Sequence, residues 1–219
     1  LLMNIMKDIS TFGDDPLSPQ RIHHEIEAGR LVYRDRSLYL GDPNFSTIPV
    51  DELLSAEYAN SLRAAIDPDV ATSPLPDLSL PRHKSTVYIS VVDKDRNVCS
   101  LINTVFHGFG SGILAPVSGV LLKKRGMGFV LDPAHPNCIA PGKRPLHTIN
   151  TGMLTRNGKA VMPFGVMGGD YQGFGHMHFL TRLLESGMDV QQAQDTPRFF
   201  ADAHGSFVEV EHTISPETR

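Results

Sequence analysis

The chain has 219 residues and a formal net charge of −4, with 41% hydrophobic and 20% charged residues. This composition is typical of a globular protein of one or two domains. It lacks the basic excess by which proteins bind nucleic acid, so no nucleic-acid partner is expected. No apolar run reaches the roughly 18 residues that a membrane helix requires, so no membrane span is expected. No leader is visible, but the chain reads like the carboxyl-terminal part of something longer, so the compartment, cytoplasmic or exported, stays open.

The cysteines and histidines do not form a recognisable metal-binding pattern. Cys99 and Cys138 are the two cysteines, and their spacing matches neither a disulfide framework nor a zinc site. A single disulfide and two reduced thiols are both compatible with the sequence. Asp132, His135 and His147 offer side chains that metals use, but their spacing does not support a site. We therefore expect no metal and no cofactor.

The first third of the chain is predicted to be helical, because its apolar residues recur at helical spacing. Ser18 and Pro19 are typical of a helix start, and the Gly41-Asp42-Pro43 segment is typical of a stop. The predicted helices cover residues 1–12, 19–33, 50–54 and 56–66. Residues 67–85 then hold four prolines among Asp and Ser residues, without periodicity, and are predicted to form a linker or exposed loop.

The remainder of the chain is rich in strand signals. Val87–Val92 and Val98–Val105 are β-branched and aromatic runs around a polar turn, so residues 87–105 are predicted to form a hairpin. Asn157-Gly158 is a second strong hairpin signal. The predicted strands are 87–92, 98–105, 119–122, 151–154, 160–163 and 207–210, and the predicted helices are 172–185 and 190–195. Glycine-rich loops are expected at 108–112 and 165–169, and an irregular proline-rich loop at 133–145.

Thr86 stands directly after the proline-rich linker, at the start of a predicted strand. If the chain is cut between Ser85 and Thr86, Thr86 acquires a free α-amine whose reference pKa is about 7.7–8.0. That pKa is close to what a general base needs near neutral pH. One residue then supplies both the nucleophile and the base. Local sequence alone favours the alternative, an ordinary threonine in a strand.

Several strings along most of the chain occur together in a characteristic order. They are Tyr39-Leu40-Gly41-Asp42-Pro43, Leu53-Leu54-Ser55-Ala56-Glu57-Tyr58, Tyr88-Ile89-Ser90-Val91-Val92-Asp93, Pro141-Gly142-Lys143-Arg144-Pro145, Gly168-Gly169, Gly187-Met188-Asp189-Val190 and Pro197-Arg198-Phe199. With these strings the chain resembles the γ-glutamyltransferase (glutathione hydrolase) family. The resemblance implies an α+β fold, the four-layer αββα sandwich of N-terminal-nucleophile hydrolases, with two facing antiparallel sheets between helical layers. That fold is expected to be partial here, because the first part of the large subunit is absent.

The resemblance also implies a precursor that cuts itself into a large and a small subunit. Residues 1–85 would be the helical carboxyl-terminal part of the large subunit, ending in the proline-rich linker 67–85. Residues 86–219 would be the catalytic small-subunit part. The rest of the large subunit is therefore an expected partner, and a homo-oligomer is left open.

Five residues receive a catalytic or cleavage role from the resemblance. Cleavage would separate Ser85 from Thr86, and Thr104 would support the Thr86 hydroxyl by hydrogen bonding. The backbone N–H groups of Gly168 and Gly169 would stabilise the oxyanion, since glycine permits the unusual dihedrals that such a loop needs. The structural alternatives are an ordinary strand threonine for Thr104 and a plain turn for the glycines.

The substrate-binding positions depart from the family pattern. Arg125 stands at a usual Gln, Gly128 at a usual Asp and Phe106 at a usual Asn, while His147 and Thr148 replace a serine pair. A substrate ammonium group loses its charged partner, an effect of about 1.5–3 kcal/mol. Arg125 either binds a substrate carboxylate in bidentate fashion or is a solvated surface cation. His147 is expected to form a wall or donate a hydrogen bond, because the mechanism already has a base.

The leading hypothesis is a self-processing amidohydrolase or acyltransferase that cleaves γ-glutamyl amides such as glutathione through a Thr86 acyl-enzyme. One alternative is an amidase of the glutaryl/cephalosporin-acylase type with an altered acyl pocket. The other is an uncleaved, inactive remnant that survives as a structural or binding module.

Overall fold

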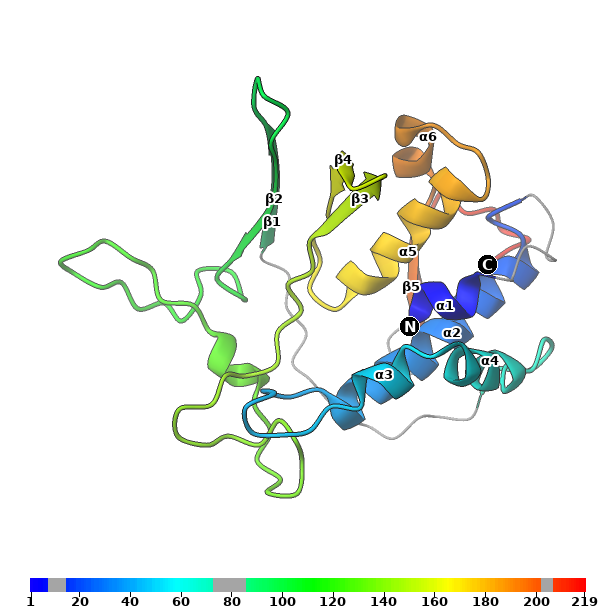
Figure 1. Cartoon of the computed structure of the whole chain (residues 1–219). Coiled ribbons are helices and arrows are strands. Elements are labelled where there is room, and N and C mark those ends of the chain that lie inside the picture. The colour runs from blue at the N-terminus through cyan, green and yellow to red at the C-terminus, as the bar shows by residue number, and fades with distance from the viewer. Residues whose placement is uncertain (8–14, 73–85, 202–206) are drawn as a thin grey trace. The chain divides into compact units, whose positions relative to one another are not determined.

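The computed structural model describes residues 1–7, 15–72, 86–201 and 207–219 (Figure 1). The chain forms two compact units. The first comprises Leu1–Ser79, Ala134–Pro136 and Met177–Arg219, and the second comprises Leu80–Pro133 and Asn137–His176. Across the described ranges, no helix has both the length and the apolar character needed to cross a membrane. The predicted division at residues 85 and 86 concerns a cleavage event and stays a prediction.

The first unit is mainly helical, as its apolar spacing predicted. Its elements are α1 (Leu2–Met6), α2 (Pro19–Tyr39), α3 (Val50–Leu53), α4 (Ala56–Ala64), α6 (Val190–Asp195) and the antiparallel pair β5 (Phe199–Ala201) and β6 (Val208–Val210). Helix α5 (Tyr171–Leu184) begins in the second unit and ends in the first. The short strand β5 was not predicted, and α2 continues six residues past its predicted end at residue 33. Residues 8–12 of the first predicted helix lie outside the described ranges.

Helix starts in this unit follow from local side-chain chemistry. The Ser18 hydroxyl accepts a hydrogen bond from the Arg21 N–H at 3.3 Å, with Pro19 in the first helical position of α2. The Ser55 hydroxyl caps α4 by accepting from the Tyr58 N–H at 3.0 Å. A reciprocal capping box of Asp189 and Gln192 opens α6. The sequence therefore fixes where these helices begin.

A buried ionic network joins α2 to the carboxyl-terminal half of α5. Glu25 on α2 accepts from the Arg21 Nε at 2.7 Å and from the Arg182 Nη1 at 3.3 Å, and the His178 Nε2 lies 3.2 Å from its carboxylate. Burial raises the Glu25 pKa, but the charge of Arg182 and the hydrogen bonds and charge from His178 and Arg21 outweigh it and hold the pKa at about 2. The apolar core of this unit includes Ile5, Met6, Ala28, Leu31, Met177, Phe199 and Ile214.

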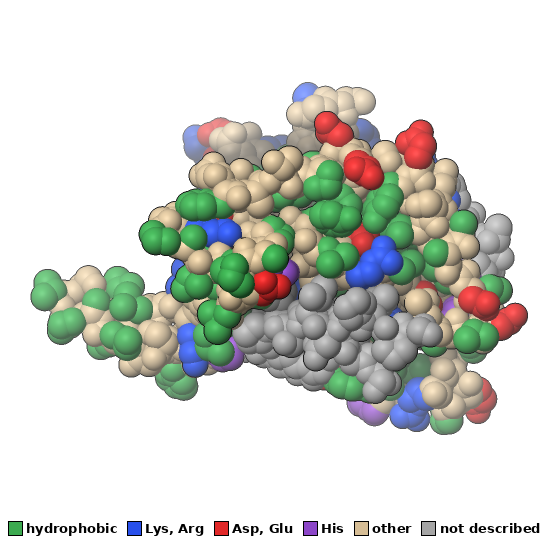
Figure 2. Space-filling view, turned by 90° about the horizontal axis from the view of Figure 1, so that it is seen from below, with side chains coloured by type: hydrophobic (Ala, Val, Ile, Leu, Met, Phe, Trp, Pro, Cys, Tyr) green, Lys and Arg blue, Asp and Glu red, His purple; other side chains and the backbone are tan. Residues whose placement is uncertain are grey.

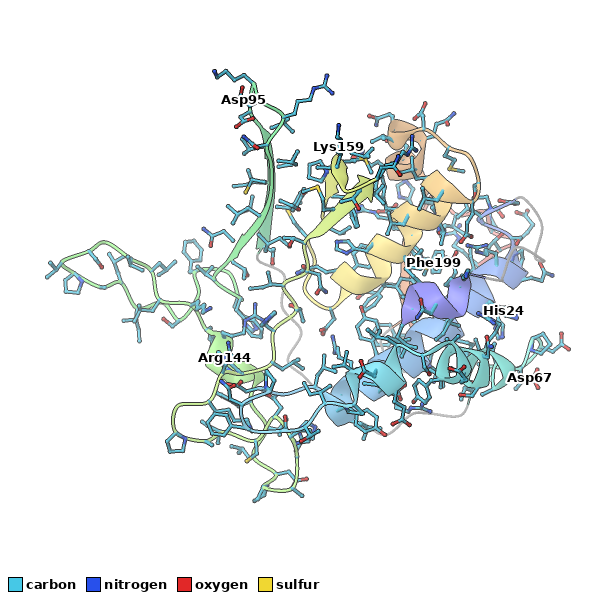
Figure 3. All side chains as sticks on the ribbon, viewed as in Figure 1. His24, Asp67, Asp95, Arg144, Lys159 and Phe199 are labelled. Atoms are coloured by element: carbon cyan, nitrogen blue, oxygen red, sulfur yellow. The ribbon has the colours of Figure 1, made fainter. Side chains whose placement is uncertain are left out.

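The second unit is built on two antiparallel hairpins. They are β1 (Thr86–Val92) with β2 (Val98–Thr104), and β3 (Gly152–Arg156) with β4 (Lys159–Phe164). Both were predicted, and Figure 3 shows Asp95 and Lys159 at their turns. Asn157 and Gly158 have φ angles of 52° and 73°, the left-handed pair that an Asn-Gly hairpin turn requires. The predicted mixture of helices with antiparallel strands, an α+β class, is confirmed.

The predicted strand at 119–122 is wrong. Leu114 and Leu121 form only an isolated bridge, and Gly119, with a φ of 68°, makes a turn between them. The segment projects from the second unit in Figure 1, and hydrophobic side chains cover the projection in Figure 2. Main-chain hydrogen bonds join Ala115 to Val120 and Leu122 to Ile113, but the apolar side chains Val120 and Leu122 are exposed, and Val117 in the intervening turn is fully exposed.

The two cysteines, Cys99 and Cys138, are free thiols. Cys99 is exposed and Cys138 is half-buried. Of the two alternatives that the sequence left open, the structure has the reduced pair.

Candidate active site

Thr86 and Thr104 lie directly opposite one another in the β1–β2 hairpin. They are register partners, and the Thr86 hydroxyl donates to the Thr104 hydroxyl over a long distance of 3.4 Å. Thr104 in turn accepts a hydrogen bond from the Phe106 N–H at 3.0 Å. Both threonines are half-buried rather than enclosed in a core. The Thr86 hydroxyl therefore has the Thr104 hydroxyl as a defined neighbour at the end of the β1–β2 hairpin away from its turn. Ser85 lies outside the described residues.

The strand that carries Thr86 is fixed against the segment that leads to the glycine pair. A Cβ built on Gly165 would lie only 2.2 Å from the Tyr88 ring, so the ring packs directly on that glycine. The Tyr88 hydroxyl is 3.0 Å from the Ser100 hydroxyl, which donates to the Phe164 carbonyl at 3.4 Å. These contacts hold β1 and β2 beside the end of β4.

Gly168 and Gly169 form the entrance to α5. Their φ angles of 126° and 63° lie in the region that favours glycine, and a Cβ on Gly168 would stand 3.2 Å from the Tyr171 Cβ. Their carbonyls accept from the N–H groups of Tyr171 and Gln172, each at 3.2 Å. A helix start of this kind favours negative charge, which suits the predicted oxyanion role without testing it.

Arg125 is buried against Phe106, the residue whose N–H binds Thr104, and is not a solvated cation. It lies in a short 3-10 turn, Arg125–Gly128, and the residue is only 5% exposed. Its guanidinium carbon sits 4.3 Å above the ring of Phe106, which is 3% exposed and has a φ of 79°. The His107 ring stacks on Phe106 with centroids 4.9 Å apart. Burial lowers the Arg125 pKa, while the charge of Asp170 acts in the opposite direction.

Two buried amides that the sequence did not single out position the segment of His147 and Thr148. Asn137, which is fully buried, donates to the Gly128 carbonyl at 2.5 Å and accepts from the Leu146 N–H at 2.9 Å. Gln172, which is 1% exposed, accepts from the Asn150 N–H at 3.1 Å. Main-chain bonds to distant side chains leave no local sequence pattern, so these positioning residues were missed.

His147 is exposed on this segment, and Thr148 is half-buried. The His147 Nδ1 accepts from the Ile149 N–H at 3.3 Å, so its Nε2 carries the proton of the neutral ring. Partial burial lowers the His147 pKa, and the positive charges of Arg125, Lys123 and Arg144 lower it further. Figure 3 shows Arg144 on the loop that precedes His147.

Gly128 leaves little room for the carboxylate that the family pattern places there. A Cβ at this position would lie 3.1 Å from the Leu146 carbonyl oxygen. Leu146 is held in place because its N–H donates to the Asn137 side chain. In the part of the chain that the structure describes, no group of three or more His, Cys, Asp or Glu side chains is arranged to hold a metal ion.

Comparison with known proteins gives a consistent result. The model of the gamma-glutamyltranspeptidase family matches residues 1–219. The glutathione hydrolase proenzyme of Pseudomonas sp. (strain A14) is 35% identical over 100% of this chain and 40% of its own length. The oxamate amidohydrolase proenzyme of Klebsiella pneumoniae is 34% identical over 82% of this chain and 34% of its own length.

A solved structure, that of cephalosporin acylase from Bacillus halodurans, is 34% identical with a TM-score of 0.83. The alignment covers 99% of this chain and 39% of the acylase chain. The chain therefore spans about 40% of the length of these relatives. The predicted fold of N-terminal-nucleophile hydrolases, partial in this chain, is confirmed, and the chain belongs to the gamma-glutamyltranspeptidase family.

Proposed function

We propose that this protein is a self-processing amide hydrolase whose nucleophile is Thr86. The observation that carries the proposal is the placement of Thr86 at the first position of β1, opposite Thr104 and directly after the linker. Family membership supports it, because curated relatives are named as proenzymes.

The first reaction is cleavage between Ser85 and Thr86. The Thr86 Oγ attacks the Ser85 carbonyl carbon, the peptide C–N bond breaks, and the released nitrogen takes up the hydroxyl proton. The resulting ester is hydrolysed by water, which restores the Thr86 hydroxyl and leaves Ser85 with a carboxylate. Thr86 then carries the free α-amine that serves as its own base.

The second reaction is turnover. The free amine takes the proton of the Thr86 hydroxyl, whose oxygen attacks the substrate amide carbon. The N–H groups of Gly168 and Gly169 stabilise the oxyanion. The proton passes to the leaving amine, the C–N bond breaks, and an acyl-enzyme remains. Water hydrolyses this ester, or an acceptor amine removes the acyl group, and the threonine is regenerated.

The favoured substrates are γ-glutamyl amides such as glutathione, in keeping with the glutathione hydrolase proenzymes among the relatives. The second candidate is an amide whose acyl group lacks the α-amine, as for the acylase and the oxamate amidohydrolase. It is favoured by the buried cation Arg125 and by the glycine at position 128, where a carboxylate would be needed for an ammonium.

The proposed partner is the remainder of the large subunit. Four apolar side chains on the β1–β2 hairpin are about half exposed: Val87 at 46%, Ile89 at 42%, Val91 at 55% and Leu101 at 48%. Apolar strand surface of this extent favours coverage by further protein. The relatives contain about 60% of their length beyond the aligned part, since 40% is covered.

The test is the Thr86→Ala variant, with Thr86→Ser as its matched control. Intact mass and amino-terminal sequencing of the complete protein should show a product beginning at residue 86 in the wild type and in Thr86→Ser. Thr86→Ala should remain an uncut chain without amidase activity. Cleavage or hydrolysis that persists in Thr86→Ala contradicts the proposal. An uncut wild-type chain supports the inactive-remnant alternative.

A further inference from the structure

The guanidinium of Arg125 has one edge that the structure leaves without a hydrogen-bond partner. Its Nε and Nη2 atoms are buried, and neither has a partner among the described residues. These two nitrogens lie on the same edge of the planar group, and their N–H bonds point in the same direction. That edge matches the two oxygens of a carboxylate.

Two other arginines in the described part of the chain show what this edge binds. Arg198 uses the same two nitrogens, Nε and Nη2, to bind the carboxylate of Glu211, and Arg21 directs its Nε to Glu25. Arg125 is as buried as Arg21, at 5% and 6% exposure, yet its corresponding edge has no such acceptor. A buried charged donor without an acceptor costs free energy, so an anion arriving there replaces a missing interaction.

Contacts connect this edge to the nucleophile in three steps. The guanidinium lies 4.3 Å above the Phe106 ring, the Phe106 N–H donates to the Thr104 hydroxyl, and that hydroxyl accepts from Thr86. The cation–π contact also stabilises the guanidinium at this position. These contacts place Arg125 two residues away from Thr86 in the chain of contacts, with Phe106 and Thr104 between them.

The charges that act on the His147 ring, one of which is that of Arg125, are positive. Lys123, Arg144 and Arg125 all act on the His147 ring from the surrounding segments. Asp170 is the acidic residue whose charge acts on Arg125, but it does not occupy the Nε and Nη2 atoms. The balance of charge favours an anionic group over a cationic one.

We propose that Arg125 is the subsite for a free carboxylate on the acyl group of the substrate, and that it selects acyl groups which carry this carboxylate. The inference rests on the proposed function, since the acyl group is the part of the substrate that is transferred to Thr86. Arg125 donates two parallel N–H···O bonds from its open edge. Phe106 holds the guanidinium in place.

The experiment uses four 4-nitroanilides that differ only in the acyl group. Glutaryl carries the carboxylate alone, γ-glutamyl carries both carboxylate and amine, 4-aminobutyryl carries the amine alone, and butyryl carries neither. Arg125→Gln in the complete, processed protein should lower kcat/KM for the two carboxylate-bearing anilides by roughly 10- to 100-fold, the effect of losing a charge-assisted pair of bonds. The loss should appear mainly in KM. The other two anilides should change by less than about 3-fold, within the range expected when no specific interaction is lost.

Two further variants separate recognition from packing. Arg125→Lys keeps a cation over Phe106 but lacks the two-nitrogen edge, so it should lose part of the carboxylate preference while retaining activity on butyryl anilide. Arg156→Gln, at an exposed arginine on β3, is the matched control and should leave all four anilides unchanged. An equal loss for all four anilides in Arg125→Gln would mean that Arg125 only supports Phe106, and an unchanged profile would mean that it does not bind substrate. Either result overturns the inference.

Direct binding keeps this inference distinct from the proposed function. Glutarate and the neutral amide butyramide are titrated into wild-type and Arg125→Gln protein by calorimetry. Glutarate binding that is lost in the variant, with no such effect for butyramide, supports the subsite even if no anilide is hydrolysed. Glutarate that binds both proteins equally, or neither, refutes the subsite even if Thr86 proves to be the nucleophile.

Discussion

Replacing Thr104 by valine removes one oxygen and keeps the shape of the side chain. That oxygen accepts from the Phe106 N–H at 3.0 Å and from the Thr86 hydroxyl at 3.4 Å. Phe106 is 3% exposed, so its N–H loses its acceptor in a buried place, which costs about 1–3 kcal/mol. The Thr86 contact is longer than the usual range for hydroxyl pairs and contributes less. We expect the unfolding free energy to fall by about 1–3 kcal/mol and kcat to fall about tenfold, which corresponds to about 1.4 kcal/mol.

The assay separates folding from catalysis. Denaturant unfolding gives the stability, intact mass gives the processed fraction, and anilide hydrolysis is expressed per processed chain. Thr104→Ser, which keeps the oxygen, is the control and should resemble the wild type in kcat. Should Thr104→Val match the serine variant in both stability and kcat, the hydroxyl does not support the nucleophile and the reasoning fails.

Two other substitutions test the glycine pair and the buried network. Gly168→Val should lower kcat by about 100-fold or more through loss of the oxyanion donor geometry. Gly187→Val is the control and should affect only stability, because Gly187 has a φ of 67° and nothing lies within 4 Å of an added Cβ. Equal kcat values for the two variants would make 168–169 a plain turn. Glu25→Gln should destabilise the protein at pH 7 by about 3 kcal/mol, the value of lowering a carboxyl pKa from 4.5 to about 2. Because the folded-state pKa of Glu25 is depressed, this stabilisation is present above pH 4.5 and is lost as the pH falls towards 2. Denaturant unfolding measured across that pH range should show a steep acid dependence of stability in the wild type that the variant lacks.

Local chemistry made much of the fold predictable. The β-branched run after Thr86 and the polar turn at 93–97 specify a hairpin, and that hairpin places Thr86 opposite Thr104. The Asn157-Gly158 turn requires two positive φ angles, which these residues tolerate best. The serine caps at the starts of α2 and α4 act in the same way. Each signal lies within a few residues of the structure that it determines.

Features that depend on distant residues were not predictable in this way. The burial of Arg125 depends on Phe106, nineteen residues earlier, and the roles of Asn137 and Gln172 depend on main-chain groups across loops. The 119–122 segment has the composition of a strand but bends at Gly119 and forms one isolated bridge, between Leu114 and Leu121. The sequence thus led to a prediction of which residues carry chemistry, but not of which buried groups hold them in place.

The buried network of α2 and α5 has a consequence for the mature molecule. Arg21 and Glu25 precede the proposed cut, whereas His178, Arg182 and Glu185 follow it, and Arg21 also reaches Glu185 at 3.1 Å. If the proposed cut before Thr86 occurs, these ion pairs no longer join two helices of one polypeptide but hold two separate chains together. Water-excluded charges would then contribute to quaternary structure, and protonation of Glu25 in strong acid should weaken the association of the two subunits.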